Sequence, residues 1–170
     1  MAELEVLIVG AGVIGLAIAR DLARAGLGRQ VLVLDRGAAV GSGSTARANG
    51  GVRAQFSTAI NVQFSSYTIA EFEKLDRDTG GLPRLVQAGY LLMTGSPQGE
   101  ESLRRGFELQ RSLGVGVEWL DPGRILGMAP FVRAAGLRAG SFSPRDGFID
   151  PHGVSQALWQ DARQAGAGLR

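Results

Sequence analysis

Near the N-terminus the chain reads Val6-Leu7-Ile8-Val9-Gly10-Ala11-Gly12-Val13-Ile14-Gly15, an apolar run followed by glycines at G-x-G-x-x-G spacing. This pattern is typical of a dinucleotide site, because the glycines allow a tight turn, the close approach of a pyrophosphate and the close packing of a helix on its strand. The phosphates then lie at the helix N-terminus, where free N–H groups and the positive end of the dipole meet negative charge. We therefore predict that this turn holds a dinucleotide.

The flanking residues favour the same interpretation. The short apolar run Leu4–Val9 predicts a buried strand, and the spacing of apolar residues over Val13–Ala25 predicts a helix that glycines end. Val31–Leu34 predicts a second parallel strand. Asp35 follows it, about 20 residues after the last glycine, where an acid accepts the hydroxyl groups of a ribose. A ligand site is therefore favoured over a glycine-rich turn that binds nothing.

The composition limits the chemistry that the chain can carry. Its 170 residues are enough for one domain with a sizeable core, and its formal net charge is only +2. The absence of cysteine excludes a disulfide framework, a thiolate metal site and a cysteine nucleophile. We expect a surface or capping role for His152, the only histidine, and no metal site. The arginines are scattered among acids, so we expect no nucleic-acid partner.

The first residues bear on the compartment. Met1-Ala2-Glu3 carries no basic leader, and the apolar run that follows is too short and too interrupted by glycine for a signal sequence or a membrane span. We therefore expect a cytoplasmic protein without a membrane span.

A long loop follows the second predicted strand. Residues 37–51 are rich in glycine, serine and alanine and show no hydrophobic period. Long ordered loops are usually functional, and small residues let the backbone approach a flat or bulky ligand. A flexible linker is the alternative, but Arg47, Asn49 and the nearby Arg53 are unusual in a passive tether. We predict that this loop contacts the ligand.

The middle of the chain predicts mixed helices and strands. An amphipathic helix is predicted over Phe56–Arg77, with its aromatic residues in the core. Further strands are predicted at Leu85–Val86, Tyr90–Met93, Val117–Leu120, Leu137–Ser143 and Phe148–Ile149. Helix starts are predicted where serine or aspartate precedes proline, at Ser96-Pro97, Asp121-Pro122 and Asp150-Pro151. The last helix is expected to stop at Gly166–Arg170, where a third strand of the parallel sheet would be due.

Several motifs in this order resemble a known family. The glycine turn is followed by Asp35-Arg36, Gly41-Ser42-Gly43-Ser44-Thr45, Asn49-Gly50-Gly51-Val52-Arg53, Ala88-Gly89-Tyr90-Leu91 and Asp146-Gly147-Phe148-Ile149-Asp150-Pro151. Together they resemble FAD-dependent amine oxidoreductases of the D-amino-acid oxidase type, a group that includes glycine oxidase, sarcosine oxidase, dimethylglycine dehydrogenase and the proline dehydrogenase beta subunit. The resemblance covers the whole chain.

The resemblance implies an α/β fold in which a Rossmann-like FAD-binding beta-alpha-beta unit carries an inserted α+β substrate domain. Enzymes of this group are usually more than twice as long, so we expect a chain truncated before the FAD sheet is completed. The expected parts are residues 1–55 for the FAD-binding unit and flavin loop, 56–149 for a portion of the substrate domain, and 150–170 for a helix that returns to the FAD domain.

The resemblance also implies a reaction. A hydride leaves the carbon beside an amine nitrogen and goes to the flavin, and water hydrolyses the resulting imine. The cofactor carries the difficult chemistry, so the protein supplies binding and electrostatics. The expected substrate is a small amine or amino acid such as glycine, sarcosine, dimethylglycine or proline.

The resemblance assigns roles to particular residues. In the sarcosine oxidase branch, two arginines with two residues between them lie beside the flavin and the substrate carboxylate. Arg53 matches the second, and its planar fork suits a carboxylate; a salt bridge within the loop or a contact with a phosphate is the alternative. Gly50 stands in the place of the first. No flavin-linking histidine lies near Arg47, so we expect noncovalent FAD. The predicted cofactor-binding residues are Gly10, Gly12, Val13, Ile14, Gly15, Asp35, Arg36, Ser42, Ser44, Thr45, Arg47, Asn49, Gly50 and Gly51.

Two other functions stay open at this point. Asp35-Arg36 also suits the adenosine ribose of NAD(P), so an NAD(P)-dependent dehydrogenase is one alternative. The other is a noncatalytic or split subunit that contributes half of a nucleotide site. The sheet edge left bare by such a truncation favours a partner subunit or self-association.

Overall fold

The computed structural model describes residues 4–170, and the expectation about a leader at Met1–Glu3 lies outside them. The chain divides into two compact units. The first comprises residues up to Gly51 together with 72–85 and 149–170, and the second comprises 52–71 and 86–148. No helix among the described residues is long and apolar enough to cross a membrane.

The first unit contains a parallel three-stranded sheet. β1 (Val6–Val9) leads through α1 (Val13–Leu22) to β2 (Val31–Leu34), in the predicted order. The expectation that the first strand is buried is wrong, because Leu7 and Val9 are 58% and 83% exposed and only Ile8 is buried. β8 (Gly168–Leu169) then pairs with the other side of β2, with Leu32 opposite Gly168, so the strand order is β1-β2-β8. Only a returning helix was expected over residues 150–170, whereas the end of this segment already forms a short third strand. Alternate residues of β2, Val31 and Val33, form part of the buried core.

The turn after α1 differs from the prediction in detail. The helix ends at Leu22 instead of Ala25, and a π-helical turn (Ala23–Leu27) and a 3-10 turn (Gly28–Gln30) lead into β2. Gly26 has φ 95°, in the left-handed region that favours glycine. The prediction that a glycine ends the helical conformation is confirmed, because the backbone leaves that conformation at Gly26.

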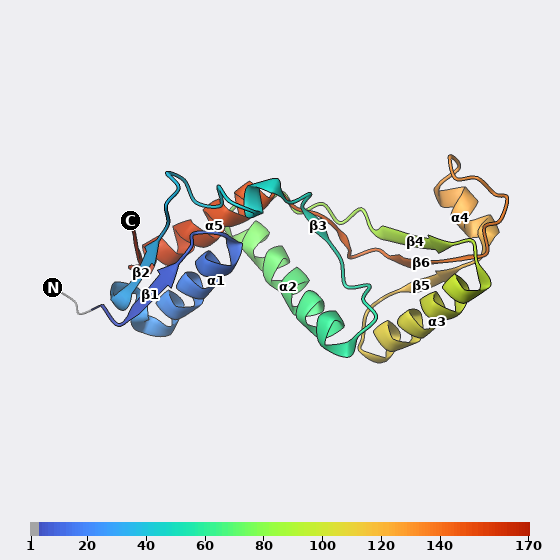
Figure 1. Cartoon of the computed structure of the whole chain (residues 1–170), viewed down its shortest axis with the longest axis horizontal. Coiled ribbons are helices and arrows are strands. Elements are labelled where there is room, and N and C mark those ends of the chain that lie inside the picture. Colours follow the sequence, from blue (N-terminus) through green and yellow to red (C-terminus); the bar gives the residue numbers. More distant parts are fainter. Residues whose placement is uncertain (1–3) are drawn as a thin grey trace. The chain divides into compact units, whose positions relative to one another are not determined.

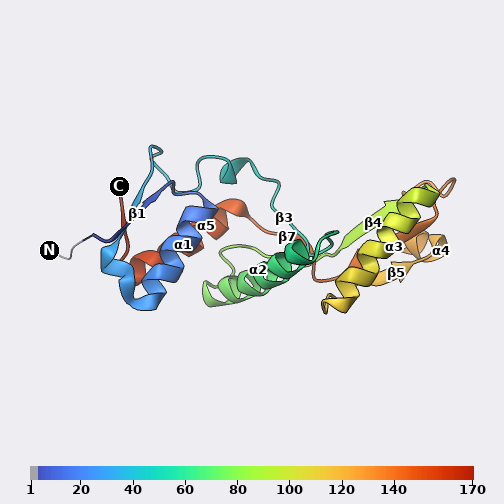
Figure 2. The same ribbon diagram turned by 60° about the horizontal axis from the view of Figure 1, so that its bottom comes forward.

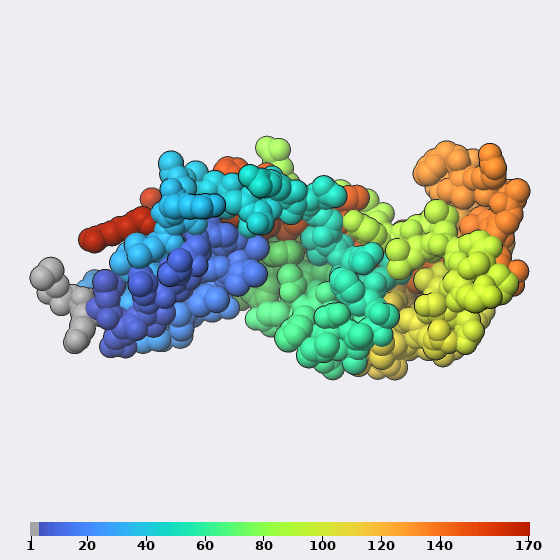
Figure 3. Space-filling view, viewed as in Figure 1, coloured from blue at the N-terminus to red at the C-terminus, as the bar shows by residue number. Residues whose placement is uncertain are grey.

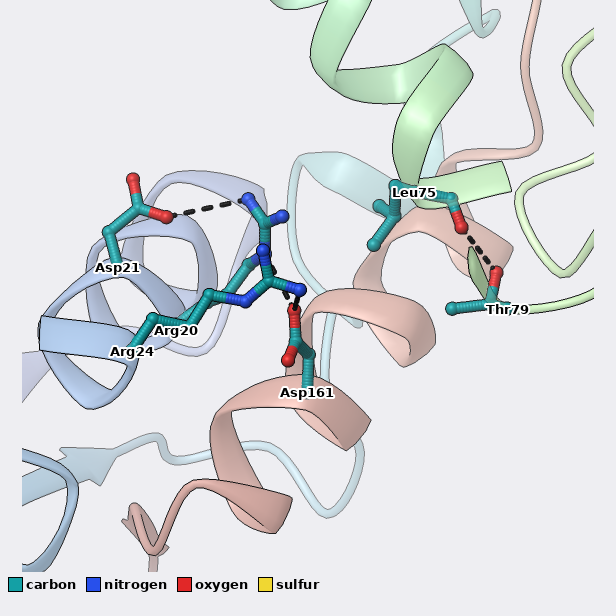
Figure 4. A network of polar contacts seen from close by, with 6 residues as sticks. All are labelled: Arg20, Asp21, Arg24, Leu75, Thr79 and Asp161. Carbon is teal, nitrogen blue, oxygen red and sulfur yellow. Dashed lines mark hydrogen bonds and ion pairs between the residues drawn. The ribbon is translucent and has the colours of Figure 1, made fainter. Parts of the chain in front are cut away.

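Helix α5 (Pro151–Gln164) packs along α1 in this unit (Figures 1 and 2). Asp150 caps it, accepting a hydrogen bond from the backbone N–H of His152, and the His152 side chain is exposed. Figure 4 shows an ion-pair network between the two helices, in which Asp161 accepts from Arg20 Nε at 2.8 Å and pairs with Arg24 at 2.6 Å. Arg20 is only 5% exposed, so this network ties α5 to α1.

The second unit is built on an antiparallel sheet of order β4-β6-β5, formed by β4 (Tyr90–Thr94), β6 (Ala139–Ser143) and β5 (Glu118–Leu120). α3 (Pro97–Ser112) packs along this sheet, and α4 (Pro122–Met128) packs on β6 (Figure 2). Both helices begin at the predicted caps, where Ser96 and Asp121 accept backbone hydrogen bonds. β3 (Gly51–Val52) and β7 (Gly147–Phe148) form a separate two-stranded sheet.

Two expectations about the middle of the chain are wrong. Leu85–Val86 forms no strand, since Val86 makes only an isolated bridge to Phe148. The long helix, α2 (Ala59–Asp78), does form, but two of its aromatic residues are not core residues, because Phe64 is 64% exposed and Tyr67 is 66% exposed; Phe72 is half-buried. Aliphatic residues on the opposite face of α2, such as Val62, fill the core instead. Periodicity alone identified an apolar stripe without showing which side of the helix the core occupies.

Candidate cofactor site

The glycine turn between β1 and α1 is formed by residues that tolerate no side chain or need an unusual backbone. Gly10 has φ 109°, a conformation that L side chains rarely adopt. A Cβ at Gly15 would lie 2.0 Å from the carbonyl oxygen of Gly10, so only glycine lets α1 pack this closely on the end of β1. The first glycine of the motif is thus required for its backbone conformation, and the third for the close contact between helix and strand.

The N-terminus of α1 provides hydrogen-bond donors. Gly12 is its N-cap and makes no side-chain capping bond. The N–H of Val13 donates to Thr45 Oγ1 at 3.1 Å, and a Cβ at Gly12 would lie 3.3 Å from the same oxygen. The Thr45 hydroxyl therefore accepts from the helix end and still has its own hydrogen to donate. Backbone donors of the first turn, together with this hydroxyl, make a cradle that suits a phosphate.

Asp35 lies at the end of β2 beside this cradle. One of its oxygens accepts from the N–H of Ala11 and the other from the N–H of Gly37, each at 2.7 Å. The hydrogen bond from Gly37, then that from Ala11, lowers the pKa of Asp35 below its ordinary value of 3.8, against a small opposing effect of burial. A carboxylate has about four acceptor positions, so two remain for the hydroxyl groups of a ribose.

The loop of residues 37–47 lies against the glycine turn. Gly41 N–H donates to the carbonyl of Ala11 at 2.7 Å, and a short 3-10 helix over Thr45–Arg47 brings Thr45 to α1. In the space-filling view the light-blue atoms of this loop adjoin the blue atoms of the N-terminal segment (Figure 3). Several of the predicted cofactor-binding side chains are exposed in this region. They are Ser42, Ser44 and Arg47 of the loop, and Arg36 beside Asp35.

The backbone conformation and the close surroundings of position 50 both favour glycine. Its φ is 71°, and a Cβ there would lie 2.1 Å from the carbonyl oxygen of Ile149. Gly50 O accepts from the N–H of Ile149 at 2.8 Å, so the two backbones are in direct contact. An arginine at this position would be strained in the present backbone conformation, so the missing first member of the expected arginine pair is consistent with the local structure. The neighbours Asn49 and Gly51 are exposed.

Arg53 belongs to the second unit. Its side chain is exposed, and its guanidinium carbon lies 4.9 Å from the centre of the Phe56 ring. Such a contact holds a cation without neutralising it. The guanidinium therefore keeps its donors for an anionic group.

Sequence reasoning missed several residues that shape these sites. The backbone N–H groups of Ala11 and Gly37 hold the carboxylate of Asp35 in place. Ser155 Oγ would lie only 2.5 Å from a Cβ at position 41, so it leaves room for a glycine alone. Asp146, which the sequence analysis names only within a family motif, is completely buried and accepts a hydrogen bond from the segment that follows Arg53. Apart from the bond between Gly37 and Asp35, which are two positions apart, these contacts join residues far apart in sequence, and no local pattern reports them.

Comparison with known proteins gives one consistent picture. A family model described as FAD dependent oxidoreductase matches residues 5–170. Human mitochondrial dimethylglycine dehydrogenase is 30% identical over 98% of this chain and 19% of its own length. Glycine oxidase of Geobacillus kaustophilus is 32% identical over 97% of this chain and 45% of its own length. The crystal structure of L-proline dehydrogenase from P. horikoshii superimposes with a TM-score of 0.87 at 28% identity, covering 98% of this chain and 43% of that one. The chain thus spans less than half the length of each.

Proposed function

The chain belongs to the family of FAD dependent oxidoreductases, and from this premise we propose that it forms the N-terminal portion of an enzyme that oxidises an amine or amino acid. The observation that carries the proposal is the cradle at the start of α1, where the N-terminal donors, Thr45 and Asp35 together suit a dinucleotide. FAD, when bound, accepts the hydride from the substrate carbon. Because the matching family is FAD-dependent, we do not propose the alternative of an NAD(P)-dependent dehydrogenase.

Each part of FAD has a proposed set of residues. The backbone of the glycine turn, Gly10 to Gly15, with Val13 and Ile14 at the helix start, would hold the pyrophosphate, assisted by Ser42, Ser44, Thr45 and Arg47. Asp35 and Arg36 would hold the ribose of the adenosine. Asn49, Gly50 and Gly51 would line the flavin. We propose noncovalent FAD, since residues 42–51 contain no histidine or cysteine to link it.

A titration with FAD and, separately, with NAD tests the cofactor. We expect FAD to bind and its fluorescence to change, and Asp35→Ala to weaken binding about 10- to 100-fold, because a charged hydrogen bond contributes roughly 1.5–3 kcal/mol. Asp78→Ala is the matched control, since Asp78 is an exposed acid at the end of α2 in the same unit. Binding of NAD but not FAD would overturn the proposal.

Arg53 is the residue proposed to bind the substrate. Relatives of the chain are named for glycine, dimethylglycine and L-proline, which all carry a carboxylate. The exposed guanidinium of Arg53 would pair with that carboxylate through two parallel hydrogen bonds. Its role would be to hold the carboxylate end of the substrate.

Turnover of an amine panel in the full-length protein tests this assignment. We expect Arg53→Ala to raise the KM for glycine, sarcosine and proline by about 10- to 100-fold. Arg133→Ala is the matched control, because Arg133 is an exposed arginine of the same unit. An equal effect of Arg53→Ala on an amine that lacks a carboxylate would show that Arg53 does not bind the carboxylate.

The edge of β1 supports a proposal about association. β1 pairs only with β2 in the described sheet, and its Leu7 and Val9 are 58% and 83% exposed. A bare strand edge with apolar side chains favours pairing with another chain. We propose that the isolated 170-residue chain self-associates through this edge, and light scattering at rising concentration measures it. A monomer at all concentrations would contradict this.

A further inference from the structure

A cluster of buried polar residues in the second unit has no role in the assignments above. Asp146 is 0% exposed, Gln55 is 3% exposed, and Ser141 and Ser143 are each 1% exposed. Two of them come from β6, Asp146 comes from the turn after it, and Gln55 comes from the segment after Arg53. Burying polar groups costs free energy unless hydrogen bonds compensate, so the contacts of the cluster show what it holds in place.

Those contacts converge on the backbone next to Arg53. Asp146 Oδ1 accepts from the N–H of Ala54 at 3.0 Å and from Ser143 Oγ at 2.9 Å. Asp146 Oδ2 accepts a longer bond of 3.4 Å from Gln55 Nε2, which also donates to the carbonyl of Tyr90 at 2.9 Å. The carboxylate of Asp146 therefore fixes the main chain at Ala54, the residue directly after Arg53.

The residues on either side of Ala54 are fixed as well. Ser141 Oγ donates to Gln55 Oε1 at 2.8 Å. Gln110, which is 4% exposed, donates from Nε2 to the carbonyl of Phe56 at 3.0 Å. The ring of Phe56 in turn lies under the Arg53 guanidinium, 4.9 Å away. Arg53 is thus exposed, but the main chain of the segment that follows it is held by hydrogen bonds to buried side chains.

We propose that Asp146 is a positioning residue for Arg53. It holds the N–H of Ala54 so that the guanidinium of Arg53 occupies one place, ready for the carboxylate of an amino-acid substrate. This inference rests on the proposed function of Arg53. A fixed guanidinium binds a carboxylate more tightly than a mobile one, because less side-chain freedom is lost on binding.

Asp146→Asn in the full-length protein is the first test. Asparagine keeps the shape and one acceptor oxygen, but it removes the negative charge that strengthens the bonds from Ala54 and Ser143, and it places an amide nitrogen against the Gln55 Nε2 donor. We expect amide hydrogen exchange in the peptide covering residues 53–57 to accelerate about 10- to 100-fold. The same variant should raise the KM for an amino-acid substrate by about tenfold with a smaller change in kcat. Asp146 also lines a cavity of about 80 Å³, so water can reach Ala54 once its hydrogen bond to residue 146 is weakened.

A double-mutant cycle separates positioning from general destabilisation. In an Arg53→Ala background, Asp146→Asn should cause no further rise in KM, because the group that it positions is already absent. Asp121→Ala is the matched control. Asp121 caps α4 in the same unit through a 3.0 Å bond to Arg124 N–H, so its loss destabilises the unit without touching residues 53–56. We expect no change in KM from Asp121→Ala.

The outcomes for the two proposals differ. If Arg53→Ala leaves the KM unchanged, the proposed function of Arg53 fails by itself. If Arg53→Ala raises the KM but Asp146→Asn does not, or if the two effects are additive, the positioning role of Asp146 is wrong and Arg53 keeps its function. Should Asp146→Asn fail to fold, Ser143→Ala removes one donor to the same carboxylate and should shift exchange and KM in the same direction by a smaller factor.

Discussion

Gly15→Ala tests how closely the helix of the cofactor site must pack on its strand. The added Cβ would lie 2.0 Å from Gly10 O and 3.2 Å from Ile8 Cγ2. Real Cβ atoms essentially never come closer than 3.0 Å, so the start of α1 must move away from the end of β1 by about 1 Å. The carbonyl of Gly10 cannot yield instead, because the N–H of Gly10 is bonded to Leu34 O at 2.7 Å.

The cost follows from two opposing effects. Overpacking of this kind costs typically about 1–3 kcal/mol, occasionally more. Alanine offsets part of this, since it is favoured over glycine inside a helix by about 1 kcal/mol. The 2.0 Å approach to a backbone oxygen places this change toward the upper end of that range, so we expect a net loss of about 1–2 kcal/mol in the free energy of unfolding. The displaced helix N-terminus should also weaken FAD binding, because its N–H groups no longer face the cradle.

Thermal unfolding followed by circular dichroism measures the loss. For a chain of this size we expect a midpoint lower by about 2–8 °C, together with faster hydrogen exchange in peptides from α1. Gly43→Ala is the matched control, because a Cβ at Gly43 meets nothing within 4 Å. If Gly15→Ala behaves like Gly43→Ala in both stability and FAD affinity, then close packing at Gly15 is not what the motif requires.

Three further changes test other contacts of the first unit. Thr45→Val removes the acceptor of the Val13 N–H and should cost about 1 kcal/mol in an unfolding titration, whereas Thr45→Ser should cost less; equal losses would contradict the capping role. Asp161→Ala removes the partner that lies 2.8 Å from the buried Arg20 and should lower the free energy of unfolding by about 1–3 kcal/mol, a range already reduced because Asp161 is partly exposed. If high salt abolishes the difference in stability between the variant and the wild type, the pair is not a buried one. Because the folded pKa of Asp35 is lowered, its stabilising contribution is present above pH 3.8 and lost as the pH falls through the folded pKa, so the unfolding midpoint of Asp35→Asn should depend less on pH in that acidic window.

Local sequence signals predicted much of the fold. The glycine turn, both strands beside it and the helix starts after Ser96, Asp121 and Asp150 all form where the sequence indicated. Each depends on residues within a few positions of one another. A proline after a capping side chain fixes a helix start almost without reference to the rest of the molecule.

Contacts between distant residues could not be predicted in this way. Thr45 meets Val13 across 32 positions, and Asp146 meets Ala54 across 92 positions. The exposure of Phe64 and Tyr67 on α2 has the same origin, because the side of a helix that faces the core depends on which elements pack there. The sequence therefore identified the candidate residues of the cofactor site but not the neighbours that hold them.

The placement of β8 beside β2 sets a delay during synthesis. Leu32 pairs with Gly168, which is made 136 residues later. At about 5–20 residues per second, a ribosome needs roughly 7–27 s to cover that distance. During this time the second edge of β2 stays open on the nascent chain, although β1 and α1 have already emerged. Ribosome pauses or chaperones that act in this interval would therefore affect the yield of folded protein more than those that act before residue 32.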